Sequence, residues 1–301
     1  MSETVLITGA GGFIGSNLIP QLVRADYNVI AIDNNITKLT NLNADCNKVE
    51  VDITNRESMS KFAVGLNIDS VVHLAAIAAP RYAEEHPDLT FNVNVQGTYA
   101  VLKLAKSADV QRVVFMSSAH VYGISPKYMP TDETHPLYLL DTYTTSKVLG
   151  ENLCQLFYEN HNLSYLALRL FNGYGPDQQE GYFIPDMIAK AKKGDITLKG
   201  GHVTKDFVYI DDIIDAILKS LDSKYVGSLN VGTGVQTTLR DVAQHIGDAF
   251  GRKVTCVETD DKGATHMQAD IGKVISVLDW RPKVNIDVGL QRAIGFNKDS
   301  V

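Results

Sequence analysis

Apolar residues in the first part of the chain alternate between short continuous runs and longer stretches with helical spacing. Residues 4–8 form a β-branched, apolar run, which is typical of a strand buried on both faces of a parallel sheet. Over residues 13–24 the apolar positions recur as on one face of a helix, and residues 27–33 form a second apolar run. The pattern therefore predicts a strand, a helix and a second strand in succession.

The same alternation continues to residue 170. Strands are predicted at residues 48–51, 70–74, 112–116 and 164–170, and helices at residues 55–66, 88–107 and 141–161. Strands that alternate with helices in this way favour an α/β fold with a doubly wound parallel sheet of Rossmann type.

The pattern changes after residue 170. Residues 172–176 are predicted as a loop, and the rest mixes short strands with helices, the strands at 196–198 and 254–257 and the helices at 184–193, 210–220, 239–250 and 288–296. We therefore expect two domains, a Rossmann-type domain over residues 1–170 and a smaller C-terminal α/β lobe over residues 171–301. Segments such as 205–235 could pack back on the first domain.

Composition narrows the class of protein. The 301 residues are 45% hydrophobic and 21% charged, as in ordinary globular proteins. Asp and Glu number 35 against 28 Lys and Arg, without a basic block, which argues against nucleic acid as a partner. No apolar run is long enough for a membrane span and no basic leader precedes the first strand, so we expect a cytoplasmic protein. The three cysteines lack metal-ligand spacing, and no metal is expected.

A glycine-rich turn separates the first strand from the first helix. Gly9, Gly12 and Gly15 have the spacing G-x-x-G-x-x-G, and Phe13 and Ile14 open the helix. Backbone N–H groups of such a turn can approach a pyrophosphate closely, and the helix N-terminus adds partial positive charge. A purely structural glycine turn is the alternative. The position directly between strand and helix favours a dinucleotide site.

Two acidic residues follow the next two strands. Asp33 ends the second strand, 18 residues after Gly15, where a carboxylate can accept hydrogen bonds from ribose hydroxyls and repel a 2′-phosphate. No Arg or Lys comes between it and Lys38, so the predicted cofactor is NAD rather than NADP. Asp52, after the third strand, could reach the adenine edge. For both residues a local capping role is the alternative.

A tyrosine and a lysine lie on one face of a predicted helix. Tyr143 and Lys147 are four residues apart, so their side chains point the same way. An ammonium about 4 Å from a phenol is worth about 4 kcal/mol at an effective dielectric constant of ~20, or about three pKa units. Such a phenol is a good general base for removing an alcohol proton. The alternative is a surface pair in which the lysine covers the ring.

Ser117 and Ser118 follow the fifth strand, at the carboxyl edge of the sheet, where such folds bind their ligands. The hydroxyl of Ser118 could hold a substrate oxygen and share its proton with the tyrosine. The alternative is that these serines only cap the end of the strand.

Together with further segments, these residues form a series of motifs in a familiar order. The series is Thr8-Gly9-x-x-Gly12-Phe13-Ile14-Gly15, His73-Leu74-Ala75-Ala76, Asn94-Val95-x-Gly97-Thr98, Ser117-Ser118-x-x-Val121-Tyr122-Gly123, Tyr143-x-x-x-Lys147, Leu168-Arg169-x-Phe171-Asn172-x-Tyr174-Gly175-Pro176, Asp206-Phe207-Val208-Tyr209-Ile210-Asp211-Asp212 and Leu278-x-Trp280-x-Pro282. The chain thereby resembles the extended short-chain dehydrogenase/reductases, and among them the NAD-dependent nucleotide-sugar epimerase/dehydratase family, over nearly its whole length.

The resemblance assigns roles by position. It implies a catalytic Ser118, a base at Tyr143 and a lysine at Lys147 that also binds the nicotinamide ribose. Asn172 falls where members contact the substrate diphosphate, and we expect Ser118, Asn172 and Lys205 to bind substrate. The residues expected to bind the cofactor are Gly9, Gly12, Phe13, Ile14, Gly15, Asp33, Asn34, Asp52, Ile53, Leu74, Ala75, Ala76, Asn94, Tyr143 and Lys147. For Asn94 a structural role near the active site is expected, and for His73 a packed position at the end of a strand.

The chain departs from the family pattern at several positions. Dehydratases of the family usually have acidic residues just after the catalytic Ser/Thr, whereas this chain has Ala119 and His120, which favours epimerisation. His120 could serve as an acid or base, or be a partly buried loop histidine. Many relatives have an arginine at the position of Lys205, and a second family arginine has no counterpart around residues 261–263. Lysine supplies charge without the bidentate fork of arginine.

These observations predict an NAD-dependent sugar-nucleotide epimerase, acting at C4 through a transient 4-keto intermediate. Alternatives are an NAD-dependent dehydratase, a net dehydrogenase, and a catalytically silent NAD-binding regulatory protein. The predicted helices at 88–107 and 141–161 match those by which relatives pair, so a homodimer is expected.

Overall fold

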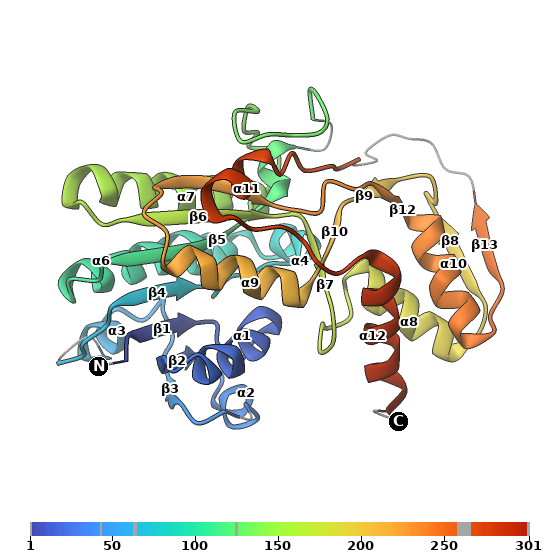
Figure 1. Ribbon diagram of the computed structural model, residues 1–301. Coiled ribbons are helices and arrows are strands. Elements are labelled where there is room, and N and C mark those ends of the chain that lie inside the picture. The colour runs from blue at the N-terminus through green and yellow to red at the C-terminus, as the bar shows by residue number, and fades with distance from the viewer. Residues whose placement is uncertain (1, 43, 63–64, 124–125, 258–265, 300–301) are drawn as a thin grey trace. The chain divides into compact units, whose positions relative to one another are not determined.

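The computed structural model describes residues 2–42, 44–62, 65–123, 126–257 and 266–299. The predicted first unit is present as β1 (Thr4–Thr8), α1 (Phe13–Arg24) and β2 (Asn28–Asp33). The other strands of the large sheet are β3 (Asn47–Glu50), β4 (Ser70–His73), β5 (Arg112–Ser118), β6 (Tyr165–Leu170) and β11 (Gly227–Val231). The strand order is β11-β6-β5-β4-β1-β2-β3 (Figure 1). This is the predicted Rossmann-type α/β sheet.

This strand order shows where on the sheet a ligand can bind. β1 pairs in parallel with both β2 and β4, and Thr8 lies in register with Ile32 on one side and His73 on the other. The order reverses between β1 and β4, and crevices for ligands form outside the carboxyl ends of strands at such a switch point. The glycine turn after β1 and residues 74–76 after β4 therefore lie side by side.

Helices cover both faces of the sheet, which explains the continuous apolar runs of its strands. Leu6 contributes to a core with α3 (Arg56–Phe62), α6 (Thr98–Ser107) and α7 (Thr142–His161). Figure 1 shows α1 and α9 (Ile210–Leu221) in front of the sheet, on the face opposite to that core.

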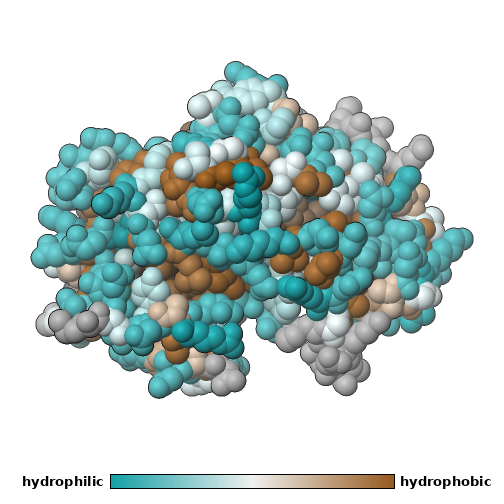
Figure 2. Space-filling model, in the orientation of Figure 1, coloured by the Kyte–Doolittle hydropathy of each residue, from teal (hydrophilic) through white to brown (hydrophobic). Residues whose placement is uncertain are grey.

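On the face drawn in Figure 2, hydrophilic residues predominate and apolar residues form small separate patches.

One predicted helix contains an irregular turn. The stretch predicted as a helix at 88–107 consists of α5 (Pro87–Phe91), a π-helical segment η1 (Asn92–Gly97) and α6. Wide turns of this kind are rare and occur often at functional sites. The described part of the chain also has short helices that were not predicted, namely α2 (Ile36–Thr40), α4 (Pro80–Glu85) and α11 (Gly272–Leu278). Among the helices within the described ranges, none is long and apolar enough to cross a bilayer.

Within the described residues, the later part of the chain forms three small sheets. β7 (Asn172–Tyr174) pairs with β10 (Phe207–Tyr209), β9 (Thr204–Lys205) with β12 (Thr237–Thr238), and β8 (Ile196–Lys199) with β13 (Val254–Val257). The helices here are α8 (Phe183–Lys193), α10 (Leu239–Phe250) and α12 (Ile286–Asp299). The prediction of a loop over residues 172–176 was wrong at its start, because Asn172–Tyr174 is hydrogen-bonded to β10 and its glycine does not prevent strand pairing.

The chain divides into two compact units, and each is made of several segments. Unit 1 comprises Met1–Val121, Leu137–Arg169 and Ile214–Leu229, and unit 2 comprises Tyr122–Pro136, Leu170–Ile213 and Asn230–Val301. Unit 1 therefore holds the glycine turn, Ser118, Tyr143 and Lys147, whereas unit 2 holds Asn172 and Lys205.

Candidate functional site

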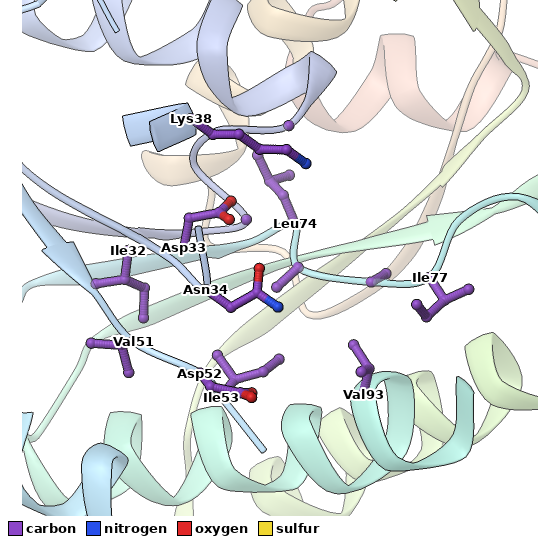
Figure 3. A pocket seen from close by; sticks show the side chains of 14 residues that line it. Ile32, Asp33, Asn34, Lys38, Val51, Asp52, Ile53, Leu74, Ile77 and Val93 are labelled. Carbon is purple, nitrogen blue, oxygen red and sulfur yellow. The ribbon is translucent and has the colours of Figure 1, made fainter. Parts of the chain in front are cut away.

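A pocket of about 290 Å³ lies at the carboxyl ends of strands β1 to β4 in unit 1 (Figure 3). Most residues predicted to bind the cofactor line it, namely Gly9, Gly12, Asp33, Asn34, Asp52, Ile53, Leu74, Ala75 and Ala76. Phe13, Ile14 and Gly15 form the first turn of α1 and are not among the lining residues. Ile32, Lys38, Val51, Ile77 and Val93 complete the lining and were not predicted.

The glycine turn fits the close approach of a dinucleotide. Gly9 has a φ of +66°, and a Cβ there would lie 2.6 Å from the backbone nitrogen of Ala75. A Cβ on Gly15 would lie 2.6 Å from the carbonyl oxygen of Ala10. Glycine therefore lets β1, the turn and α1 pack this closely. Gly12 is the N-cap of α1, and no side chain caps its first turn, so the positive end of the helix is available to a phosphate.

Asp33 has both a structural contact and access to the pocket. Its Oδ2 accepts a hydrogen bond from the N–H of Gly11 at 3.1 Å, and its Oδ1 accepts one from the N–H of Asn35 at 3.1 Å. Each carboxylate oxygen can accept more than one hydrogen bond, so Asp33 can also take ribose hydroxyls. Asp52 lines the pocket too, and its Oδ1 accepts from the N–H and hydroxyl of Thr54, both at 2.8 Å. Asp52 thus makes a local capping contact whatever else it binds.

Lys38 lines the pocket, although its distance from Asp33 along the chain did not predict this. It lies five residues beyond Asp33, but Asn35 caps α2 through hydrogen bonds from Thr37 and Lys38, and the short helix brings Lys38 back to the pocket beside Asp33 (Figure 3). The signal that could have located it is the N-cap asparagine two residues after the strand. Asp33 remains the buried charge at this end of the pocket, and Lys38 is the exposed one.

Asn94 joins the segment after β4 to helix α7. Its Oδ1 accepts from the N–H of Ile77 at 2.7 Å, and its Nδ2 donates to the carbonyl of Ile77 at 3.0 Å and to the hydroxyl of Ser146 at 2.9 Å. The side chain lies on the π-helical segment η1 and is buried. Its amide therefore fixes the wall of the pocket against the helix that carries Tyr143.

The structure brings Ser118, His120, Tyr143 and Lys147 together in unit 1. β5 runs through Ser118, two residues further than predicted, and the 3-10 turn η2 (Ala119–Tyr122) follows. The N–H of His120 donates to Oγ of Ser118 at 3.2 Å. The ring of His120 meets the ring of Tyr143 edge-on, with centroids 6.0 Å apart. Asp141 caps α7 by accepting from Thr144 at 2.6 Å, which fixes the turn that carries Tyr143.

Lys147 is 5% exposed and lies behind Tyr143. Its Nζ donates to the carbonyl of Met116 at 2.8 Å and lies 5.9 Å from the centre of the Tyr143 ring. Burial lowers the pKa of Lys147 to about 8, while the carboxylate of Glu151 acts in the opposite direction. A buried ammonium this close to the ring favours the phenolate, because opposite charges attract strongly where water is excluded. Tyr143 and Lys147 are both buried, so the alternative of a surface pair is wrong.

His73 ends β4 and is buried between two threonines. Its Nδ1 lies 2.6 Å from Oγ1 of Thr8 and its Nε2 lies 2.9 Å from Oγ1 of Thr98. Burial, and secondarily the charge of Lys147, lower the pKa of His73 to about 3. The imidazole is therefore neutral at physiological pH, with both ring nitrogens in hydrogen bonds. No group of three or more metal-ligating side chains occurs within the described ranges.

Asn172 and Lys205 lie near one another in unit 2. Asn172 is the first residue of β7 and pairs in register with Phe207, which comes two residues after Lys205. The N–H of Asn172 donates to the carbonyl of Asp206 at 2.9 Å. Burial lowers the pKa of Lys205 to about 8. Oδ1 of Asn172 and Oε1 of Gln178 are buried, and neither has a hydrogen-bond partner in the described parts of the chain. Gln178 was not predicted, and residues 261–263 lie outside the described ranges.

Comparisons with known proteins agree with this geometry. A model of the NAD dependent epimerase/dehydratase family matches residues 5–232. A putative UDP-glucose 4-epimerase of Methanocaldococcus jannaschii is 32% identical, with 98% of this chain and 99% of that protein covered. The structure of a UDP-glucose 4-epimerase of Thermotoga maritima with UDP-glucose has a TM-score of 0.93 at 26% identity, with 99% of both chains covered.

A second solved structure concerns the cofactor. The complex of a UDP-glucose 4-epimerase of Thermus thermophilus with NAD has a TM-score of 0.91 at 27% identity, covering 99% of this chain and 100% of that one. The predicted fold, the predicted NAD cofactor and the resemblance drawn from the motifs are thereby confirmed. This chain belongs to the NAD-dependent epimerase/dehydratase family.

Proposed function

We propose that this protein is an NAD-dependent epimerase that inverts C4 of a nucleoside-diphosphate sugar, with UDP-glucose and UDP-galactose as the substrates to test first. The observation that carries the proposal is the buried Lys147 ammonium 5.9 Å from the Tyr143 ring, beside Ser118 at the carboxyl end of β5. The names of the relatives support the choice of UDP-sugar and of C4.

The chain's own residues perform the proton transfer. Tyr143, held as phenolate by Lys147, takes the proton of the sugar hydroxyl and later returns it. Oγ of Ser118 accepts from the N–H of His120, so its own proton can be donated to the sugar oxygen. Bound NAD supplies the acceptor of the hydride and afterwards its donor. The keto sugar formed must turn within the site so that the hydride returns to the opposite face.

The cofactor and substrate contacts are proposed on the same basis. The glycine turn and the first turn of α1 would hold the pyrophosphate, and Asp33 the adenosine ribose. Lys205, half-buried and without a carboxylate partner in the described parts of the chain, would bind the substrate diphosphate together with Asn172. A half-buried cation loses part of its hydration, and an anionic ligand that pairs with it offsets that cost.

The test is direct. The purified protein with NAD is incubated with UDP-glucose, and product is separated by chromatography while absorbance at 340 nm follows NADH. We expect UDP-galactose without accumulation of NADH. Stoichiometric NADH would indicate a net dehydrogenase, and a stable product that has lost water would indicate a dehydratase. NAD binding without turnover of any sugar nucleotide would favour the regulatory alternative.

We also propose a homodimer that pairs through α6 and α7. Tyr99 on α6 is 40% exposed and Leu156 on α7 is 49% exposed, and Leu149 on α7 is exposed as well. The two helices pack against each other in unit 1, so these side chains belong to one neighbouring pair of elements. Large exposed apolar side chains that gather on packed helices favour a protein interface. Light scattering at micromolar concentration would give the mass of two chains.

A further inference from the structure

Glu151 lies one helical turn beyond Lys147 on α7 and joins that helix to three strands. Its Oε1 accepts from Oγ of Ser117 on β5 at 2.5 Å and from Nε of Arg169 on β6 at 3.0 Å. Its Oε2 accepts from Nη2 of Arg169 at 2.7 Å and from Oγ of Ser228 on β11 at 3.1 Å. Glu151 is 6% exposed and Arg169 is 5% exposed, so solvent does not weaken these contacts.

These bonds fix the end of β5 against α7 at two successive residues. Met116 accepts from Nζ of Lys147, and Ser117 donates to Glu151. Ser118 is the next residue of the strand. Because Tyr143, Lys147 and Glu151 follow one another at intervals of four residues on α7, they lie on one side of the helix. The position of Ser118 relative to Tyr143 is therefore set in part by the carboxylate of Glu151.

The buried charges of Lys147, Glu151 and Arg169 influence one another. The cations of Lys147 and Arg169 both lie in unit 1 near the buried carboxylate of Glu151. Without that carboxylate, burial and the repulsion of the second cation would both favour loss of the Lys147 proton. Burial lowers the pKa of Lys147, and the carboxylate of Glu151 raises it. Other titratable groups of the described residues also face this pair. His73 on β4 and Tyr143 on α7 lie near Lys147, Cys154 on α7 and Tyr165 on β6 lie near Glu151, and His120 on η2 contacts the ring of Tyr143.

We propose that Glu151 is a positioning residue of the reaction: it keeps Lys147 protonated behind Tyr143 and fixes Ser118 against α7, while Arg169 limits its negative charge. The consequence for the reaction rests on the proposed epimerase function, but the effect on Lys147 does not. Ser117 and Ser228 orient the carboxylate and carry no charge themselves.

The test compares two variants that change the buried charge in opposite directions. In Glu151→Gln, Lys147 is expected to lose its proton about one pH unit lower than in the wild type, and in Arg169→Met at a higher pH than in the wild type. Titration of Lys147 is followed by NMR of protein with ¹³C-labelled lysine, its signal assigned with Lys147→Arg. Ser228→Ala removes one hydrogen bond to the same carboxylate without changing charge, and Lys147 should titrate there as in the wild type.

A variant that leaves a buried charge unpaired can fail to fold. Should Glu151→Gln do so, Arg169→Met is compared with the double variant Glu151→Gln/Arg169→Met, because both lack the arginine and only the first retains the carboxylate. Lys147 is then expected to titrate at lower pH in the double variant. A merely structural role of Glu151 would leave the titration of Lys147 unmoved in each comparison, and that result would overturn the proposal.

Activity gives a second readout. A one-unit shift from a pKa of about 8 lowers the protonated fraction of Lys147 about eightfold at pH 8.5 and less than about 1.5-fold at pH 6.5. The loss of kcat in Glu151→Gln should therefore be much greater at the higher pH, and a loss equal at all pH values would contradict the proposal. Absence of epimerase activity in the wild type would refute the proposed function, while the NMR titration would still decide the role of Glu151.

Discussion

Replacement of Gly9 by alanine should abolish tight NAD binding while the chain still folds. At its φ of +66° a Cβ would lie 2.6 Å from the nitrogen of Ala75 and 2.9 Å from the carbonyl carbon of Leu74. Both are backbone atoms of the segment after β4, so no rotation of a side chain relieves the overlap. The turn after β1 must therefore move away from β4, and the pocket at their carboxyl ends must change its shape.

Two contributions set the size of the effect. The left-handed conformation costs a residue with a Cβ about 1–2 kcal/mol. Forcing an extra carbon into packed surroundings costs about 1–3 kcal/mol more, so the free energy of unfolding should fall by about 2–5 kcal/mol. If the displaced turn loses about 3 kcal/mol of its contacts with the pyrophosphate, NAD affinity falls about 100-fold.

Isothermal titration calorimetry with NAD and thermal denaturation would measure the two effects. Gly251→Ala is the matched control, because Gly251 has a φ of +63° and a Cβ there meets no atom within 4 Å. It should lose about 1 kcal/mol of stability and bind NAD as the wild type does. The reasoning is refuted if Gly9→Ala retains wild-type NAD affinity, or if Gly251→Ala loses as much affinity as Gly9→Ala.

Four further predictions concern the site and the proposed dimer interface. Tyr143→Phe should lower kcat about 10²- to 10⁴-fold with little change in NAD affinity, and steady-state kinetics with calorimetry would check this. Lys205→Ala should raise KM for a UDP-sugar about tenfold or more, with a smaller change in kcat, as charge-assisted bonds are lost. The pKa of His73 is 6.5 in the unfolded chain and about 3 in the folded one, so the unfolded state binds the proton first as pH falls. The free energy of unfolding should therefore fall by up to about 1.4 kcal/mol per pH unit between these values. In urea unfolding, His73→Asn should show a shallower dependence of stability on pH, because asparagine does not titrate. Leu156→Glu should give monomers in light scattering, and an unchanged mass would argue against the proposed interface.

The elements that were predicted from sequence are those whose signal is local. The apolar runs of β1 and β2 and the glycine turn between them define a strand, a turn and a helix without reference to the rest of the chain. The pair Tyr143 and Lys147 was located by the interval of four residues on an amphipathic helix. Both inferences depend only on spacing within a few turns of the backbone.

What was missed depends on contacts between distant segments. The pocket position of Lys38 follows from the cap of a five-residue helix, and such helices leave little periodicity to detect. The role of Glu151 requires Ser117, Arg169 and Ser228 to meet from three different strands, which no spacing along the chain records. β7 was taken for a loop because its pairing with β10 joins residues about 35 positions apart.

The π-helical segment η1 also restricts which insertions and deletions this protein can tolerate. Removing one residue from Asn92–Gly97 would restore an ordinary helical turn, but it would rotate everything downstream by about 100°. Either Asn94 would leave Ile77 and Ser146, or the apolar side chains of α6 would leave the sheet. Sequence drift here is thus confined to substitution, and anyone who shortens or redesigns this scaffold should keep the length of that turn fixed.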